Sequence, residues 1–174
     1  MPVNEDYAAG IIPFIRDLNE IYLLLGREKC NRCWCGFVGG KDSTDRNVED
    51  TAWREFNEET SQFFENQKLN IAKAFSDHNY KLLINHSPKR PVYIYLMEFS
   101  KKFLLENTVL TNLFLNKLNT MQKREYKEKD DIRWINLNEL SEYKLLYIFK
   151  RDKHKIVGSL KDLTGVTSIN SSFD

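Results

Sequence analysis

The residues with the clearest chemical potential are three glutamates, Glu55, Glu58 and Glu59, which follow Gly39-Gly40 after a polar gap. On a helix they stand at i, i+3 and i+4, so their carboxylates share one face. Like charges at that spacing repel each other. A hard divalent cation such as Mg²⁺, which takes carboxylate and phosphate oxygens, would offset this repulsion. The pattern therefore predicts a metal site for phosphate chemistry.

A solvated acidic helix face is the alternative interpretation of the same residues. Two features favour the metal site instead. Ala52, Phe56 and Phe63 form an adjacent apolar stripe that would hold the helix against a core. The double glycine also precedes the helix at a distance that lets a loop fold back over its start.

These residues resemble the Nudix box, written G-x5-E-x7-R-E-U-x-E-E-x-G-U, where U is apolar. The first glycine falls on Gly40, and the core R-E-U-x-E-E falls without insertions on Arg54, Glu55, Phe56, Glu58 and Glu59. Three positions depart from the box. The first glutamate is Arg46, the late glycine is Ser61 and the last apolar position is Gln62.

The resemblance implies a hydrolase that cleaves within the pyrophosphate of a nucleoside diphosphate linked to another group, with Mg²⁺ or Mn²⁺ as cofactor. It makes Glu58 and Glu59 the main metal ligands, and Glu55 a further ligand or a base that orients water. Arg54 would belong to the catalytic set by orienting the glutamates through ion pairs. Gly39 and Gly40 would let the backbone pass close to the helix and the substrate.

Arg46 is the departure with a chemical consequence. The family glutamate at this position usually pairs with the box arginine, so two arginines would face each other here. Asp42, Asp45 or Glu49 could take its place if the loop shifts slightly. Because the three ligand carboxylates are intact, the loss is expected to weaken the scaffolding and not metal binding. A non-catalytic nucleotide- or RNA-binding module on the same fold is the alternative function.

The segment before residue 132 offers further charged candidates. A general base could come from its acids, each of which is more typical of a solvated loop: Glu125, Glu128, Asp130 and Asp131. A basic patch for RNA phosphates could come from Lys123, Arg124, Lys127 and Lys129 with Tyr126. Because the acids are interleaved with these cations, a soluble charged loop is the preferred interpretation of the patch.

The three cysteines lie together as Cys30-x-x-Cys33-x-Cys35. A zinc site usually needs four ligands, and no second CxxC or close histidine pair completes one. Buried thiols are therefore favoured over a structural zinc, which remains the minor alternative.

The 174 residues, 41% hydrophobic and with a net charge of +1, indicate one domain over residues 1–164 and a disordered tail over 165–174. The charge gives no global attraction to nucleic acid. No leader or membrane span is evident, so a cytoplasmic location is expected. Abundant Asn, Lys and Ile are typical of an AT-rich genome, including some viral ones.

Apolar periodicity predicts the elements that position the site. Strands are expected at 8–15, 21–25, 34–38, 71–75, 80–84, 92–99 and 132–137. Helices are expected from about 47 to 64, over 101–121 as one or two pieces, and from 140 to about 155. This is an α/β chain. The order is similar to the Nudix fold, an α/β/α sandwich around a mixed sheet, with residues 101–121 as an added helical segment.

Substrate choice is not readable from the box. The open classes are free nucleotides or dinucleotides, nucleotide sugars and ADP-ribose, and the 5′ cap of mRNA. The expected partner is thus a nucleotide-type small molecule or capped RNA, with no membrane and with a homodimer as an open alternative.

Overall fold

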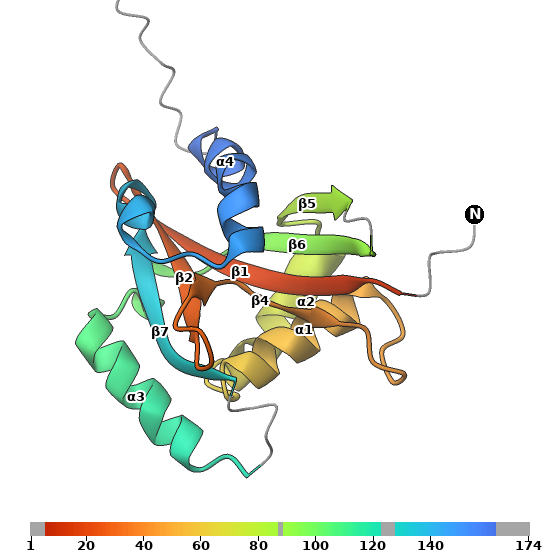
Figure 1. Ribbon diagram of the computed structural model, residues 1–174, viewed down its shortest axis with the longest axis horizontal. Coiled ribbons are helices and arrows are strands. Elements are labelled where there is room, and N and C mark those ends of the chain that lie inside the picture. Colours follow the sequence, from red (N-terminus) through yellow and green to blue (C-terminus); the bar gives the residue numbers. More distant parts are fainter. Residues whose placement is uncertain (1–5, 87–88, 123–127, 163–174) are drawn as a thin grey trace, which may run out of the picture.

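The computed structural model describes residues 6–86, 89–122 and 128–162, and in these ranges seven strands form one sheet. The strands are β1 (Ala8–Asp17), β2 (Glu20–Glu28), β3 (Trp34–Cys35), β4 (Phe37–Gly40), β5 (Lys81–His86), β6 (Pro91–Glu98) and β7 (Lys129–Asn136). The α-helices are α1 (Val48–Glu59), α2 (Lys68–Ser76), α3 (Asn107–Asn119) and α4 (Tyr147–Lys161) (Figure 1).

The sheet is mixed, as the resemblance predicts. Its strand order is β3-β2-β1-β6-β5, with β4 also paired to β1 and β7 to β2. β1 and β6 run parallel, and the other pairs are antiparallel. The first half of β1 pairs with β4 and its second half with β2. This fork places Gly39 and Gly40 beside Ala9 and Ala8, at the edge where α1 begins.

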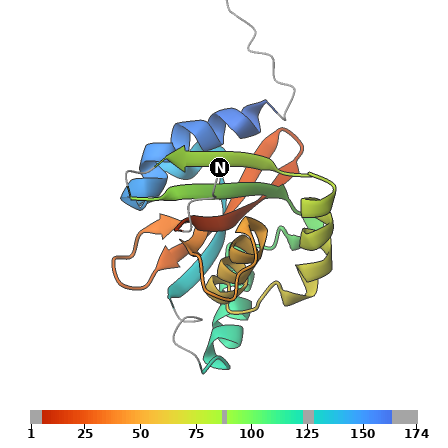
Figure 2. The ribbon, with the colours of Figure 1, turned by 90° about the vertical axis from the view of Figure 1, so that its right-hand side faces the viewer.

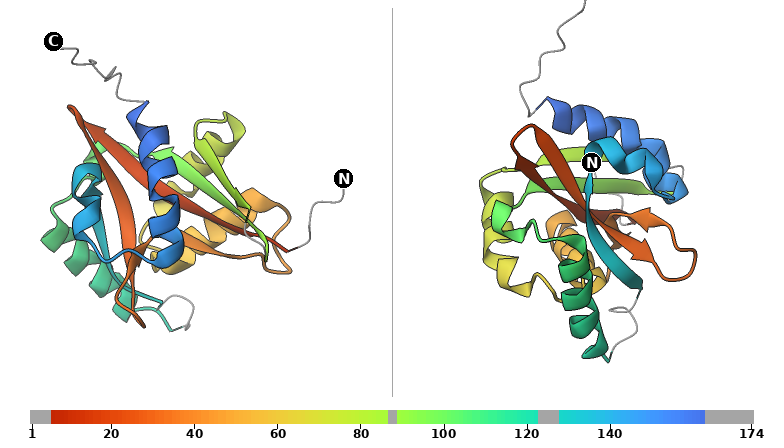
Figure 3. Two further views of the ribbon diagram at one scale, coloured as in Figure 1. Left: turned by 45° about the horizontal axis from the view of Figure 1, so that its top comes forward. Right: turned by 90° about the vertical axis from the view of Figure 1, so that its left-hand side faces the viewer.

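Side chains of β1 alternate between two cores because successive residues of a strand point to opposite faces. Ala9 and Ile11 join a core with Ala52 and Phe56 of α1, and with residues of α2 and α3. Ile12 and Phe14 join a second core, which α4 covers with Phe149, Ile156 and Leu160. Figures 2 and 3 show α1 and α4 on opposite sides of the strands. The α/β/α architecture is confirmed.

Two helices begin or end elsewhere than the sequence predicts. α1 ends at Glu59 instead of about residue 64, because Ser61 and Gln62 adopt left-handed backbone conformations with φ of 53° and 58°. The last helix begins at Tyr147, not at residue 140, since residues Leu137–Glu142 form a 3₁₀ helix.

The strand predicted over 71–75 is wrong, because this segment lies inside helix α2. Ile71 and Phe75 are four residues apart, so both reach the core from one helix face. The strand predicted over 34–38 is interrupted at Gly36, and its two parts pair with different partners, β2 and β1. The segment 101–121 divides into a 3₁₀ turn (Lys101–Phe103) and α3, which packs on β7.

The tail expected over 165–174 lies outside the described residues, as does most of the predicted basic patch (residues 123–127). Within the described part of the chain, no helix is long and apolar enough to cross a bilayer.

Candidate active site

Helix α1 presents the box glutamates on its open side. The Asn47 side chain caps the helix by accepting a hydrogen bond from the Asp50 backbone N–H at 2.8 Å. Ala52 and Phe56 are fully buried against the sheet. Glu55 and Glu58 stay partly exposed, with side chains 13% and 20% accessible. The cap thus fixes the start of the helix, and the buried side chains fix its apolar face against the sheet.

The guanidinium of Arg54 joins the loop to two of the three glutamates. It donates to Glu55 Oε1 at 2.8 Å, to Glu58 Oε2 at 3.1 Å and to the Gly40 carbonyl at 2.6 Å. Asp45 accepts from both Nε and Nη2 of Arg54, the latter at 2.9 Å. The predicted orienting contacts of Arg54 are therefore present.

Asp45 makes the ion pair with Arg54 that the resemblance assigns to the box glutamate. Its carboxylate also accepts hydrogen bonds from the Thr51 hydroxyl at 2.9 Å and the Asp42 backbone N–H at 2.8 Å. Burial raises the pKa of Asp45, but the hydrogen bonds from Arg54 and its other donors outweigh burial and lower it. Of the three substitutes predicted, Asp45 is the one that pairs with Arg54.

Arg46 points away from this network. Its side chain is 83% exposed and pairs with Asp50 at 2.6 Å, one helical turn along the chain. The expected repulsion between Arg46 and Arg54 is therefore absent. The departure from the box moves the acid by one residue and leaves the arginine paired.

Gly39 lets the sheet approach α1 closely. A Cβ atom on Gly39 would lie 2.1 Å from Glu55 Oε2, so any other residue here would displace the Glu55 carboxylate. At Gly40 a Cβ atom would lie 2.9 Å from Arg90 Nη1. Gly39 thus leaves room for the Glu55 carboxylate in its present position, whereas the neighbour of Gly40 is Arg90.

Glu59 differs from the other two glutamates because it is only 5% exposed. Its Oε1 lies 3.5 Å from Nζ of Lys129, and its Oε2 is buried with no hydrogen-bond partner. Burial raises the pKa of Glu59, and the charge of Lys129 opposes that effect. For Lys129 the charges of Glu59 and its neighbours outweigh burial and raise the pKa. The ammonium is therefore held in its charged form.

The residues present fit a divalent cation in their chemistry. Three carboxylates gather beside one helix face, and the buried Glu59 oxygen lacks a partner that a cation would supply. A cavity of about 330 Å³ lies over them, lined by Gly40, Lys41, Asp42, Arg54, Glu55, Glu58, Glu59 and Glu128. Among the described residues no three acidic, His or Cys side chains already converge as a ligand set. Arg54 and Lys129 hold the glutamates instead.

Comparisons with known proteins identify the family of the chain. A family model described as the NUDIX domain matches residues 5–156. The chain belongs to the Nudix family. No curated protein sequence matches it.

Solved structures show the same fold at low identity. A Caenorhabditis elegans Ap4A hydrolase is 17% identical, with 90% of this chain and 98% of that chain covered and a TM-score of 0.52. The NUDIX domain of Shewanella oneidensis NrtR, solved with ADP ribose, is 11% identical, with 90% and 86% covered and a TM-score of 0.51.

Of the three general-base candidates that the structure describes in this Nudix protein, Glu128 alone lines the carboxylate cavity. Asp130 pairs with Arg27 and Arg32, and Asp131 accepts hydrogen bonds from Thr111 and Arg133. Asp131 is 2% exposed, so it is a structural acid and not a solvated one. Glu125 lies outside the described residues.

The cysteines do not form a ligand cluster with one another in the described part of the Nudix chain. Cys30 is exposed, whereas Cys33 and Cys35 are buried. Burial raises the pKa of Cys35 to about 12, although Lys129 opposes this. The Cys35 thiol donates to Glu28 Oε1 at 3.2 Å. Sequence reasoning missed Glu28 and Lys129 as neighbours of the site.

A second cavity, of about 520 Å³, lies on the face of the sheet that α4 covers. Its walls are mostly apolar, with Ile12, Val38, Val92, Ile94 and Phe149, and charged residues also line it: Glu28, Lys89, Arg90, Arg151 and Asp152. Gly39 lines this cavity and also contacts Glu55 by its close approach. Neighbouring glycines thus line the two cavities, Gly39 this one and Gly40 the carboxylate cavity.

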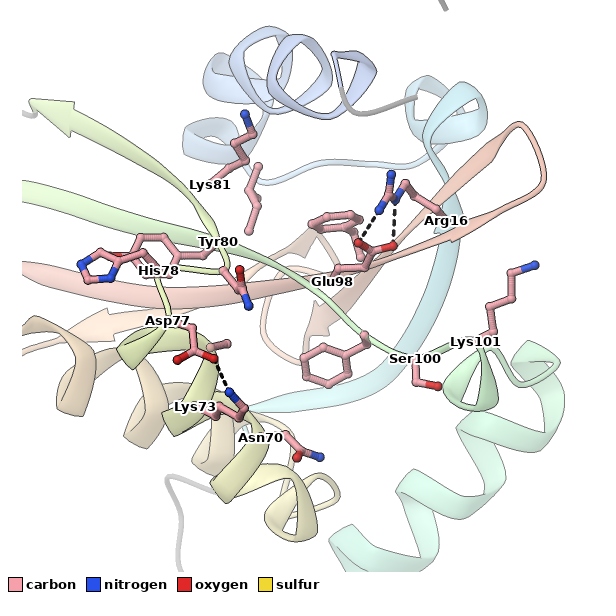
Figure 4. A pocket seen from close by; sticks show the side chains of 15 residues that line it. Arg16, Asn70, Lys73, Asp77, His78, Tyr80, Lys81, Glu98, Ser100 and Lys101 are labelled. Atoms are coloured by element: carbon pink, nitrogen blue, oxygen red, sulfur yellow. Dashed lines mark hydrogen bonds and ion pairs between the residues drawn. The ribbon is translucent and has the colours of Figure 1, made fainter. Parts of the chain in front are cut away.

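A larger hollow of about 890 Å³ lies between α2 and the strands β1 and β6, away from the box. Figure 4 shows two ion pairs in its wall, Arg16 with Glu98 and Lys73 with Asp77, and the cations Lys81 and Lys101 also line it. None of the box glutamates lines this hollow, so it is not the cavity of the predicted metal chemistry.

Proposed function

We propose that this chain is a divalent-metal-dependent pyrophosphohydrolase that cleaves a nucleoside diphosphate linked to another group. The observation that carries the proposal is the contact between Asp45 and Arg54 at 2.9 Å. It supports catalysis because Arg54, through that contact, keeps its bonds to Glu55 and Glu58 despite the arginine at position 46.

Glu55, Glu58 and Glu59 would hold the cation, Mg²⁺ or Mn²⁺. When bound, the cation would offset the negative charge that develops on the pyrophosphate oxygens. Arg54 orients Glu55 and Glu58, and the tight packing at Gly39 limits how far the Glu55 carboxylate can move. Lys41, at the rim of the same cavity, supplies a positive charge for a phosphate group.

Glu128 is the acid that would take the proton of the attacking water. It lies in the wall of the carboxylate cavity, and unlike Asp130 it does not share its position with two arginines. A general base must lie within hydrogen-bond reach of the water it activates, and the place of Glu128 in the cavity wall supports this role.

The nucleoside part of the substrate would occupy the second cavity. Its volume falls in the range of small-molecule sites, and its walls combine apolar side chains with a few polar groups. Gly39 lines this cavity and Gly40 lines the carboxylate cavity, so a diphosphate lying along the two glycines would connect the nucleoside with the metal. Arg90, which lines this cavity beside Gly40, adds a positive charge on that path.

The substrate classes left open by the sequence share this nucleoside diphosphate unit. It is present in dinucleoside polyphosphates such as Ap4A, after which the first similar structure is named, and in ADP-ribose, with which the second was solved. It is also present in nucleoside triphosphates, in nucleotide sugars and in capped RNA. The proposal therefore names the unit and leaves the second group open.

Product analysis by mass spectrometry tests the proposal. The purified chain is incubated with Mg²⁺ or Mn²⁺ and a mixture of these five substrate classes. The Glu58→Gln variant is treated in the same way as a control. We expect one class to be cleaved within its pyrophosphate, and cleavage to be lost with Glu58→Gln and with EDTA. If a folded, metal-binding protein cleaves none of them, the function is that of a binding module.

The assignment of the nucleoside cavity has its own test. Val92→Phe adds volume inside it, and Val109→Phe makes the same change on the exposed side of α3. We expect Val92→Phe to raise KM at least several-fold with little change in kcat, because it obstructs binding and not chemistry. Equal KM values for the two variants would refute the assignment.

A further inference from the structure

Lys129 is a buried cation beside the carboxylate site. It is 1% exposed, at the first position of β7. Its stem lies over Gly26 of β2, where a Cβ atom would come within 3.0 Å of Lys129 Cδ. A lysine is almost never fully buried unless it is paired, so its partners define what it does.

Three side chains from different elements surround the ammonium. Nζ donates to Glu28 Oε1 at 2.5 Å and to Cys35 Sγ at 3.0 Å, and Glu59 Oε1 lies 3.5 Å away. The contact with Glu59 is longer than a hydrogen bond, so it acts mainly through charge. Glu28 is the closest partner, and Glu59 keeps an oxygen, Oε2, that no described protein atom satisfies.

We propose that Lys129 is a positioning residue that serves as a resident cation of the carboxylate site. In the metal-free protein it holds Glu59 in place, and its charge weakens the binding of a divalent metal to that glutamate. The inference rests on the proposed function only in the assumption that the box glutamates bind a divalent cation.

The two effects follow from one charge. Four glutamates lie in and beside the carboxylate site: Glu28, Glu55, Glu58 and Glu59. Without cations, their mutual repulsion would destabilise the folded chain. Lys129 offsets it on the buried side, as Arg54 does on the open side. A metal arriving at Glu59 meets the ammonium as a like charge, so the lysine also opposes that metal.

Binding of Mn²⁺ alone tests this directly, because free Mn²⁺ is quantified by electron paramagnetic resonance without any turnover. Lys129→Met removes the charge and keeps most of the volume. We expect its Kd for Mn²⁺ to fall by about tenfold, as Coulomb's law gives for charges of +1 and +2 about 6 Å apart in water. Lys101→Met, an exposed lysine paired with Asp17 elsewhere, is the control for net charge and should leave Kd unchanged.

Thermal unfolding gives a second readout. Lys129→Met should have a lower Tm than the wild type in EDTA. Addition of Mn²⁺ should raise the Tm of Lys129→Met by more than it raises the Tm of the wild type. A lysine that serves only as packing would lower Tm by the same amount in both buffers. The proposal would be overturned if Mn²⁺ raised the Tm of both proteins equally, or if the Kd of Lys129→Met for Mn²⁺ were unchanged or increased.

Glu28→Gln keeps the inference testable if Lys129→Met fails to fold. This change keeps Lys129 but removes the negative charge of its closest partner. The positive charge of Lys129 then repels an incoming metal without the compensation that Glu28 provides. We expect weaker Mn²⁺ binding, opposite in sign to Lys129→Met, and a wild-type or lower Kd would overturn the proposal. If the wild type itself binds no Mn²⁺, the proposed function fails first, which separates the two failures.

Discussion

The carboxylate site has two sides, and a different cation holds each one. On the open side Arg54 binds Glu55 and Glu58, and it comes from the same helix as both. On the buried side Lys129 faces Glu59, and it comes from a strand seventy residues later. The first arrangement is local, hydrogen-bonded and partly exposed. The second is long-range, dominated by charge and almost fully buried.

The difference indicates where a metal would bind most firmly. Glu55 and Glu58 already use oxygens on Arg54, so a cation must share them with the guanidinium. Glu59 keeps a buried oxygen without a partner, and burial strengthens its interaction with any charge that reaches it. We therefore expect the buried side to supply the stronger ligand and the open side to supply orientation.

Replacing the glutamates one at a time should have the largest effect on activity, and it tests whether the buried side supplies the stronger ligand. Glu58→Gln and Glu59→Gln should each lower kcat/KM on the order of 10²- to 10³-fold, the range found when one electrostatic stabiliser of a transition state is removed. Glu59→Gln should weaken Mn²⁺ binding more than Glu58→Gln does. Titration of both variants with Mn²⁺ decides the order, and the reverse order would contradict the assignment of the buried side.

Asp45 and Arg46 offer a sharper test of the open side. Asp45→Asn removes the charge that pairs with Arg54, and we expect a loss of about 2–3 kcal/mol in the free energy of unfolding, somewhat less than for a fully buried pair. Activity should fall about tenfold because the glutamates lose their support. Urea unfolding and steady-state kinetics measure both.

Arg46→Glu is the matched comparison, since it restores the box residue at an exposed position. It should change activity less than about twofold, in line with the small energies of exposed ion pairs. A large gain would mean that Asp45 does not replace the missing glutamate.

Sequence reasoning reached the open side because its parts are close together in the chain. Spacing alone places Glu55, Glu58 and Glu59 on one helix face, and the loop before the helix supplies few acids that could reach Arg54. The family expected from residues 40–62 is confirmed by the match over 5–156. Asp45 is one of three acids that the sequence offers as a substitute, and only the loop geometry chooses among them.

The buried side of the site could not be predicted from the sequence, and the reason is physical. Lys129 sits in a run of alternating charges that is typical of a solvated loop, yet it is paired across the sheet with Glu28, about a hundred residues away. No local periodicity encodes such a pair. The misassigned segment 71–75 shows the same limit, because five residues of mixed polarity fit a short strand as well as one turn of α2.

The pH dependence of stability should report on the open side. The pKa of Asp45 is lowered in the folded protein, so the folded state binds fewer protons than the unfolded state near an ordinary aspartate pKa of about 4. The stability that Asp45 contributes is present above that pH and is lost as pH falls through the folded pKa. The gap in unfolding free energy between wild type and Asp45→Asn should therefore narrow from pH 6 to pH 3, as measured by urea unfolding. A constant gap would show that the Asp45→Asn substitution costs packing and not charge.

The smallest effect should come from the end of the box, where Ser61 replaces the glycine. Ser61 is fully buried with φ of 53°, a conformation that costs a side-chain-bearing residue about 1 kcal/mol or more. Ser61→Gly relieves that cost but loses the hydroxyl, whereas Ser61→Ala loses the hydroxyl and keeps the Cβ. The glycine variant should therefore be more stable than the alanine variant by about 1 kcal/mol in urea unfolding, with equal Mn²⁺ affinities. Because the turn after Glu59 fixes only where α1 ends, a change in metal affinity here would mean that the helix end also sets the position of Glu59.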